Sequence, residues 1–273
     1  MKPPAFDYLA AGSAQEAVEM LNQLGSDARI LAGGQSLMAV LNMRLAQPSA
    51  LIDISSTADL SYVRIENNHL VVGAAATQGR VEWRDSLAAE VPLLAQVFPY
   101  ISHFQVRNRG TVCGSVAHAD PSAEIPLALV ALEGDVVLRS KKKRRVVKAV
   151  DFFQGMLTTA RQPDELLEAV RFPLAVAEQK TAFTEFSVRH GDFAMASVAA
   201  IAHGQRIRLT VGGVADRPVA REWEGLGLSG LDDALNEFAW DLEAQDDHHA
   251  SARYRRHLVR QLGKKVINEV SDL

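Results

Sequence analysis

The chain has 273 residues, of which 48% are hydrophobic and 23% are charged, and its formal net charge is −4 at pH 7. This composition excludes a disordered chain, predicts a globular protein of two or three domains, and gives no reason to expect nucleic acid as a partner. The single cysteine, Cys113, excludes an intrachain disulfide, a cysteine-rich zinc site and an iron–sulfur cluster. A redox centre must therefore be organic or lie in another chain.

The start of the chain, MKPPAFDYLA, lacks the apolar segment of a secretory signal peptide, and the sequence contains no run of about 18 apolar residues. We therefore expect a cytoplasmic protein that makes no membrane contact. Cys113 lies between Val112 and Gly114 with no base close by in sequence, which favours a small buried side chain over a nucleophile.

The first region, residues 1–55, alternates between strand and helix patterns. We predict a strand at FDYL, a helix over residues 13–24, a strand at ARILA, a helix from the glycine pair to about residue 45, and a strand at ALIDI. Such alternation is typical of a small α/β unit with parallel strands.

The second region, residues 56–176, has a pattern of short strand-like runs that is typical of an antiparallel α+β unit. Strands are predicted at YVRIENNHLVVGAAA, TVCGSVAHA, DVVLRS and RRVVKAVDFF, with Asn67–Asn68 as a hairpin turn, and helices near residues 81–86, 93–100 and 126–132. The basic run at residues 141–145 is interpreted as a solvated hairpin tip, with a partner contact as the alternative.

The third region, residues 177–273, begins with three predicted strands, TAFTEFSVR, MASVAAIAH and RIRLTVGGVA, and continues as helices. The expected fold class is therefore α+β, with an antiparallel sheet and helices at the C-terminus.

Two glycine-bearing segments suggest a site for an anion. In LAGGQSLM, residues 31–38, two glycines separate a strand from a helix, where a tight turn is one explanation and a bound phosphate is another, because the first amides of a helix are unpaired. In RNRGTVCGSVAHADPSAEIP, residues 107–126, small residues would let the backbone approach a ligand, and hydroxyls would add donors. Together, the two segments suggest loops that converge on a dinucleotide diphosphate.

Two better-known nucleotide motifs do not match. Neither glycine segment continues as the Gly-Lys-Ser/Thr of a P-loop. Asp53 follows Gly33 by the spacing of a Rossmann ribose ligand, but the third glycine of that fingerprint is absent, which favours a turn residue at the end of a strand.

The segments AGGQSL, RNRGTVCGSVAHADPSAEIP and RHGDFAMA, in this order across nearly the whole chain, resemble the FAD-binding medium subunit of the molybdenum hydroxylases. The resemblance implies an FAD-binding domain of the vanillyl-alcohol-oxidase and MurB type at residues 1–176, in two subdomains (1–55 and 56–176). It also implies a C-terminal domain at residues 177–273, with a three-stranded antiparallel sheet packed on helices.

The same resemblance assigns residues to noncovalent FAD. It implies two diphosphate loops. The first is formed by Ala32, Gly33, Gly34, Gln35, Ser36 and Leu37, and the second by Thr111, Gly114 and Ser115. It also places Glu124 near the ribose, Ile101 beside the isoalloxazine and Leu167 at the adenine.

The sequence departs from the family pattern at several positions. Cys113 replaces a glycine, and Ser115 replaces an asparagine and so reaches less far. Thr184 and Glu185 stand where some relatives carry a lysine, so that contact stays unassigned.

For the remaining polar motifs, structural roles are favoured. His118 and Asp120 have no third metal ligand in sequence and are interpreted as loop residues. Arg189 and Asp192 suit either a structural turn or a flavin contact. His248 and His249 are assigned to a solvated connection. We expect no metal site and no catalytic triad.

The function that the resemblance implies is electron transfer through FAD within a heteromeric molybdenum hydroxylase. A large subunit would hold molybdopterin and a small subunit the iron–sulfur clusters, in a dimer of heterotrimers. The alternatives are a stand-alone MurB-like flavin oxidoreductase and a nucleotide-binding scaffold without catalysis. The substrate, the final electron acceptor and the stoichiometry do not follow from the sequence.

Overall fold

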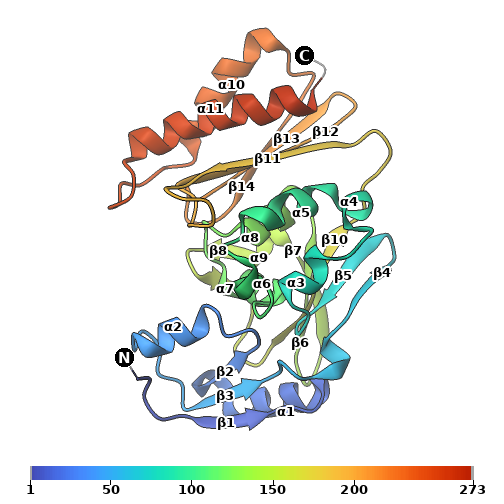
Figure 1. Cartoon of the computed structure of the whole chain (residues 1–273), viewed down its shortest axis with the longest axis vertical. Helices are drawn as coiled ribbons and strands as arrows, with labels where there is room; N and C mark the ends of the chain where they lie inside the picture. Colours follow the sequence, from blue (N-terminus) through green and yellow to red (C-terminus); the bar gives the residue numbers. More distant parts are fainter. Residues whose placement is uncertain (1, 272–273) are drawn as a thin grey trace.

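The computed structural model describes residues 2–271, and three main sheets follow one another along its long axis (Figure 1). The first sheet is parallel, with strand order β1-β3-β2. Its unit comprises β1 (Asp7–Ala10), α1 (Ala14–Leu24), η1 (Gly25–Asp27), β2 (Ala28–Leu31), α2 (Leu37–Asn42) and β3 (Ala50–Asp53). The predicted α/β unit with parallel strands is confirmed.

Local sequence explains where the two helices of this unit begin and end. The Ser13 hydroxyl accepts a hydrogen bond from the Glu16 amide at 3.1 Å, which caps α1, and Gly25, at φ +58°, ends it. Helix α2 ends before the predicted residue 45. Arg44 has a φ of +60° and Leu45 is 74% exposed, so no apolar face extends the helix.

The second sheet is antiparallel, with strand order β4-β5-β10-β6-β7. Its strands are β4 (Val63–Glu66), β5 (His69–Gly73), β6 (Asp135–Arg139), β7 (Arg144–Lys148) and β10 (Leu166–Pro173), beside a small hairpin of β8 (Phe153–Gly155) and β9 (Thr158–Thr159). Asn67 and Asn68 both have positive φ and form the predicted hairpin turn. The basic run at residues 141–145 spans the predicted hairpin tip between β6 and β7.

Short helices surround this sheet. They are η2 (Ala58–Leu60), α3 (Gln78–Glu82), α4 (Leu87–Glu90), α5 (Pro92–Val97), η3 (Phe98–Tyr100), α6 (Phe104–Arg107), α7 (Val112–His118), α8 (Glu124–Ala131) and α9 (Ala149–Phe152). No helix of residues 2–271 is both long and apolar enough to cross a membrane.

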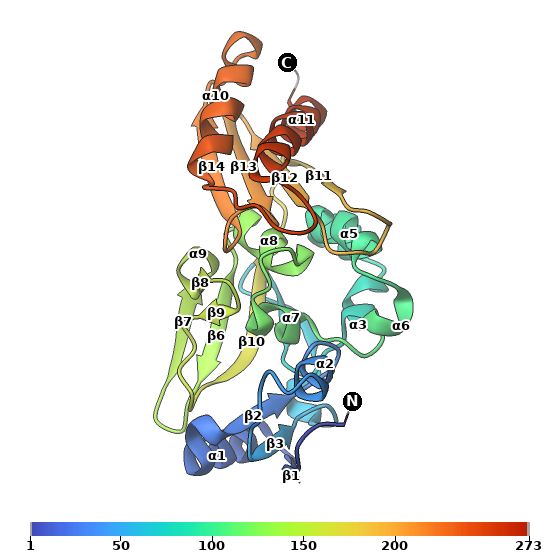
Figure 2. The same ribbon diagram turned by 90° about the vertical axis from the view of Figure 1, so that its left-hand side faces the viewer.

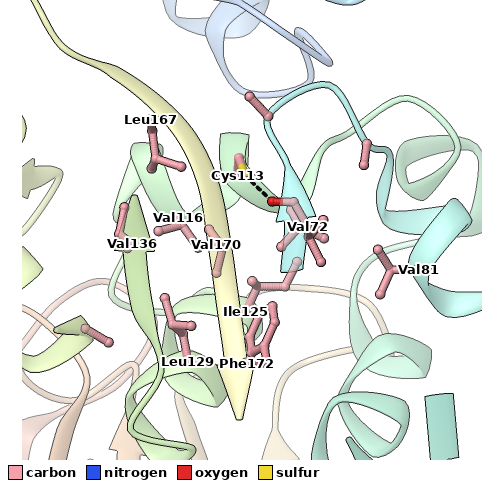
Figure 3. Packing of buried hydrophobic residues seen from close by; sticks show 14 of the residues in the cluster. Val72, Val81, Cys113, Val116, Ile125, Leu129, Val136, Leu167, Val170 and Phe172 are labelled. Atoms are coloured by element: carbon pink, nitrogen blue, oxygen red, sulfur yellow. Dashed lines mark hydrogen bonds between the residues drawn. The ribbon is translucent and has the colours of Figure 1, made fainter. Parts of the chain in front are cut away.

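Two strand predictions differ from the structure. The strand predicted at RRVVKAVDFF ends at Lys148, because residues 149–152 form α9. The strand predicted at TVCGSVAHA was wrong, because this segment forms helix α7. The Thr111 hydroxyl accepts a hydrogen bond from the Gly114 amide at 2.9 Å and caps the helix. Val112, Cys113 and Val116 then fall on one buried face, beside β10 (Figure 3). This burial outweighs the strand preference of the valines and of the threonine.

The C-terminal sheet is antiparallel as predicted, but it has four strands, in the order β11-β12-β13-β14. Its unit comprises β11 (Lys180–Phe186), β12 (Ala196–His203), β13 (Arg206–Gly212), β14 (Val219–Glu224), α10 (Leu228–Asp241) and α11 (Ala252–Val270). The missed strand, β14, lies at the edge and is rich in charged residues, so its pattern resembles that of a loop.

Both faces of the C-terminal sheet are covered (Figures 1 and 2). Helices α10 and α11 pack on one face, where Ala196, Val198 and Ala200 of β12 join the C-terminal core. The alternate residues Ala199 and Ile201 join the core of the preceding unit, against α8. The sheet therefore packs the C-terminal unit against the preceding unit through a shared apolar core.

We predict that Phe238→Ala destabilises the C-terminal unit by about 3–5 kcal/mol, because it removes a large side chain from a packed core. Phe238 is 1% exposed and packs edge-on against Trp223 at 5.9 Å between ring centroids. Urea denaturation followed by circular dichroism measures the loss. Trp240→Ala is the matched control, because Trp240 is 59% exposed. Equal losses in both variants would contradict this packing.

Candidate cofactor site at two glycine loops

The first candidate loop connects β2 to α2. Gly34 has a φ of +73°, a conformation that favours glycine, and Ser36 precedes α2 without a side-chain cap. None of the backbone amides of residues 33–37 donates a hydrogen bond to another described group. Five consecutive donors without acceptors, which lead into a helix, are suited to an anion.

The second candidate loop leads into α7. Thr111 is 4% exposed, and its hydroxyl is occupied by the Gly114 amide, so the side chain is a helix cap. A Cβ on Gly114 would lie 2.7 Å from the Thr111 hydroxyl, which explains the glycine. The amides of Val112 and Cys113 have no acceptor within the described chain, and Ser115 is half-buried.

The structure brings the two loops together. A Cβ on Gly33 would lie 2.6 Å from Gly110 Cα and closer still to the Arg109 carbonyl oxygen. The second loop is anchored in turn by the Gln78 amide, which donates to the Gly110 carbonyl at 2.7 Å. In both views α2 and α7 lie side by side (Figures 1 and 2). The two loops therefore lie against each other as the sequence suggests, and their binding of a diphosphate stays a prediction.

Arg109 is a charged residue of this site that sequence reasoning missed. Its side chain is exposed, and its carbonyl oxygen makes the close contact with Gly33. Its charge helps to lower the pKa of Asp53. Burial opposes ionisation of Asp53, but hydrogen bonds from Tyr8 and from the Ser55 amide, at 2.5 and 2.7 Å, hold its pKa below the usual range. Asp53 is thus the predicted strand-end turn residue. Only the close approach in three dimensions identifies Arg109.

Ile101 lies where the middle unit meets the C-terminal unit. It is 8% exposed, and its carbonyl accepts a hydrogen bond from Arg107 at 2.7 Å. The neighbouring Tyr100 ring stacks on His190 at 5.5 Å between centroids, and a Cβ on Gly191 would lie 2.8 Å from the Ser102 carbonyl oxygen. The RHGDFAMA segment therefore packs directly beside Ile101.

Leu167 and Cys113 are core residues. Leu167 is 5% exposed, at an irregularity in the pairing of β10 with β6 (Figure 3). The Cys113 thiol donates to the Val72 carbonyl at 3.3 Å, and burial raises its pKa. The thiol is therefore held protonated, in agreement with the predicted small buried side chain.

Glu124 is a buried carboxyl group at the first turn of α8. It is 5% exposed, and burial, with a contribution from the charge of Asp120, raises its pKa to about 7. The residue left unassigned from sequence, Glu185, lies on β11, and burial together with the charge of Glu124 raises its pKa to about 8. The two acids therefore share one environment.

The prediction that His118 is a loop residue was wrong, because His118 is the last residue of α7, whereas the other polar motifs lie in turns or at the surface. The Asp120 carboxylate accepts a hydrogen bond from the Ser122 amide at 2.9 Å within its loop. Arg189 and Asp192 pair at 3.0 Å across a turn. His248 and His249 are exposed. No group of three or more His, Cys, Asp or Glu side chains suited to a metal ion occurs among residues 2–271.

Comparisons with known proteins identify the family. Residues 4–175 match the family described as "FAD binding domain in molybdopterin dehydrogenase", and residues 181–270 match "CO dehydrogenase flavoprotein C-terminal domain". The chain is 36% identical over 284 residues to the glyceraldehyde dehydrogenase medium chain of Sulfolobus acidocaldarius, covering 99% of this chain and 100% of that protein. It is 33% identical over 280 residues to the carbon monoxide dehydrogenase medium chain of Hydrogenophaga pseudoflava, covering 98% of each.

Solved structures agree with these matches. Carbon monoxide dehydrogenase from Hydrogenophaga pseudoflava superposes with a TM-score of 0.93 at 32% identity, over 98% of both chains. Quinoline 2-oxidoreductase from Pseudomonas putida 86 superposes with a TM-score of 0.90 at 33% identity, over 99% of this chain and 98% of the other. The chain therefore belongs to the family of FAD-binding medium subunits of the molybdenum hydroxylases, which are oxidoreductases.

Proposed function

We propose that the two glycine loops hold the diphosphate of one noncovalent FAD. The observation that carries this proposal is the set of unpaired amides at residues 33–37, in a loop that contacts the loop before two further unpaired amides, at Val112 and Cys113. Backbone donors of this kind bind phosphate oxygens without a side chain. Ser36 and Ser115 belong to the same two loops and would supply further donors, and Arg109 would add positive charge beside them.

The remaining assignments follow from the family resemblance and from location. Ile101 would contact the isoalloxazine, since it lies where the RHGDFAMA segment joins the middle unit. Glu124 would lie on the ribose side and Leu167 on the adenine side. Ala32, Gln35 and Leu37 would complete the first loop. Gly33 and Gly114 are required by the fold even without a ligand, because a Cβ at either position would collide with the chain itself.

We also propose the chain's place in a larger enzyme. Bound FAD supplies electron-accepting chemistry, and this chain supplies its position and its electrostatic surroundings. The chain would receive electrons from the iron–sulfur clusters of a small subunit, downstream of a molybdopterin-binding large subunit, and pass them to an external acceptor. The similarity to "6-hydroxypseudooxynicotine dehydrogenase complex subunit alpha" of Paenarthrobacter nicotinovorans, 34% identical over 280 residues, supports assembly into such a complex.

The expected entry side for electrons is the surface around α6. Within VFPYISHFQVRN, Phe98 and Ile101 are buried, whereas Phe104 is 56% exposed. Trp83 is 71% exposed and directly follows α3. Glu82, the last residue of α3, accepts two hydrogen bonds from Arg107 of α6, at 2.7 and 2.9 Å. Trp83 and Phe104 are thus exposed apolar side chains on two segments that are joined to each other, and a partner subunit would cover them.

The same proposal includes the domain limits and the assembly. Residues 1–176 would form the FAD-binding domain, with subdomains 1–55 and 56–176, and residues 177–273 the C-terminal domain. Each of the three main sheets has all its strands within one of these three ranges, which supports this division. A dimer of heterotrimers in the cytoplasm completes the proposal.

We predict one noncovalent FAD per purified chain, because the site is built from backbone donors. Acid precipitation should release FAD into the supernatant. Flavin that stays in the pellet, or FMN in its place, would contradict the proposal. Bleaching by dithionite excludes a scaffold without redox function, and bleaching by substrate without any other subunit would favour the MurB-like alternative.

We predict that Gly33→Ala and Gly114→Ala each weaken FAD binding by about tenfold or more, since losing a hydrogen bond to a charged group costs about 1.5–3 kcal/mol. The new Cβ would push the loops apart or break the Thr111 cap. Flavin fluorescence titration measures the affinity. Gly227→Ala is the control, because nothing lies within 4 Å of its Cβ position. Unchanged affinity in both test variants would make these loops ordinary turns.

We predict that Phe104→Asp weakens co-purification with the partner subunits, or slows reduction of the flavin by substrate, while FAD stays bound. A charge would disrupt an apolar contact that the interface needs. Co-purification and rapid-mixing absorbance measure the effect. Met43→Asp is the matched control, since Met43 is also exposed but lies at the C-terminal end of α2, in a different part of the chain. Normal assembly and normal flavin reduction in Phe104→Asp would place the entry side elsewhere.

A further inference from the structure

Gln78, the first residue of α3, carries a buried side-chain amide that the folded chain does not use. The residue is 6% exposed. Its Oε1 is shielded from solvent and accepts no hydrogen bond, and its Nε2 donates none within residues 2–271. Only its backbone is engaged, since the backbone amide donates to the Gly110 carbonyl at 2.7 Å. A buried carboxamide without partners destabilises a fold, so a partner outside the chain is expected.

The Gln78 side chain lies where the two glycine loops meet. A Cβ on Gly110 would lie 3.4 Å from Gln78 Nε2 and 3.5 Å from Gln35 Cγ. The Cα of Gly110 would in turn lie 2.6 Å from a Cβ on Gly33. The carboxamide therefore stands beside the contact that joins the first loop to the second, and it reaches this place from a third segment of the chain.

Helix α3 is held in place at both of its ends. Thr77 caps the helix by accepting a hydrogen bond from the Arg80 amide at 3.2 Å, and it pairs with Thr111 of the second loop in an isolated β-bridge. At the other end, Glu82 accepts the two hydrogen bonds from Arg107. The position of the carboxamide is thus fixed before any ligand arrives, as a binding group requires.

The two ends of the carboxamide differ in access. Oε1 is closed to solvent, whereas Nε2 keeps contact with it. A ligand at the loops can therefore reach the donor end, which offers two N–H groups. Phosphate oxygens are acceptors, and hydrogen bonds to an ionised acceptor are stronger than those between neutral groups.

A purely structural role does not account for this side chain. Buried polar side chains that support this fold have partners within it. The Thr57 hydroxyl, for example, donates to the Ala11 carbonyl at 2.7 Å, and Thr57 is 1% exposed. Gln78 is about as deeply buried, yet its carboxamide contributes no hydrogen bond to the folded chain.

We infer that Gln78 is a further ligand-binding residue of this site, and that its Nε2 donates a hydrogen bond to an oxygen of the bound diphosphate. The inference rests on the proposed function, because it takes FAD as the ligand of the two loops. Helix α3 thereby contributes a third donor segment, a side-chain donor beside the backbone amides. Part of the stability that the unpaired carboxamide costs the free chain would be recovered on binding.

The test is Gln78→Met in the full-length chain, which keeps the length of the side chain and removes both polar ends. Without ligand, we expect the urea midpoint to stay equal or to rise, because removing an unpaired buried polar group is neutral or stabilising. The affinities for FAD and for ADP should each fall by about tenfold, since both carry the diphosphate. The affinity for riboflavin, which has no phosphate, should not change. Gln261→Met, at an exposed position on α11, is the matched control and should change none of these values.

A second variant, Gln78→Glu, separates a donor from an acceptor. The carboxylate keeps the shape of the side chain at pH 8, but it has no donor and repels the diphosphate. We therefore expect Gln78→Glu to weaken FAD and ADP binding more than Gln78→Met does. Binding as tight as in the wild-type chain would mean that the contact uses an acceptor and would overturn the inference.

The other outcomes are equally distinct. A lower urea midpoint in Gln78→Met would assign the residue to the fold and overturn the inference, whatever the affinity. Unchanged affinity for FAD and ADP, or a loss for riboflavin alone, would also overturn it. A wild-type chain that binds no FAD would refute the proposed function and this inference together, whereas a wild-type chain that binds FAD no better than Gln78→Met refutes this inference alone.

Discussion

The site depends on one close approach between two backbones, that of Gly33 against Arg109 and Gly110. No side chain fits between them, so glycine is required on steric grounds before any ligand is considered. This contact joins a loop of the parallel sheet to a loop that leads into α7. As a result, unpaired amides from two distant segments lie in two loops that contact each other. These amides, with Arg109 beside them, form the proposed anion site.

The rest of the fold supports this contact. The Glu82–Arg107 pair, whose side chains are 12% and 10% exposed, fixes α6 just before the second loop. Thr111 caps α7 and is itself paired with Thr77. On the opposite side, the C-terminal sheet packs its second face on α8 and α5, so that Tyr100 and Ile101 are covered. The proposed cofactor site would therefore be bounded by all three parts of the chain.

Sequence reasoning predicted the elements that have strong local signals. The helix predicted at residues 13–24, the Asn67–Asn68 turn and the apolar runs of β12 and β13 all fold as their patterns indicate. Helix α7 was predicted as a strand, because its valines favour strands locally and only their burial beside β10 decides otherwise. The edge strand β14 was missed, because it pairs on one side only and its sequence is strongly charged. The position of Arg109 beside Gly33 depends on a tertiary contact that no local pattern encodes.

The central claim is that the amides of both glycine loops bind the FAD diphosphate. The most direct measurement is hydrogen exchange of the backbone amides at residues 33–37 and at Val112 and Cys113, with FAD, with FMN and with neither. We expect FAD to slow exchange at both loops, and FMN, which lacks the diphosphate, to protect them less. Protection of neither loop by FAD, or equal protection by FMN, would contradict the account.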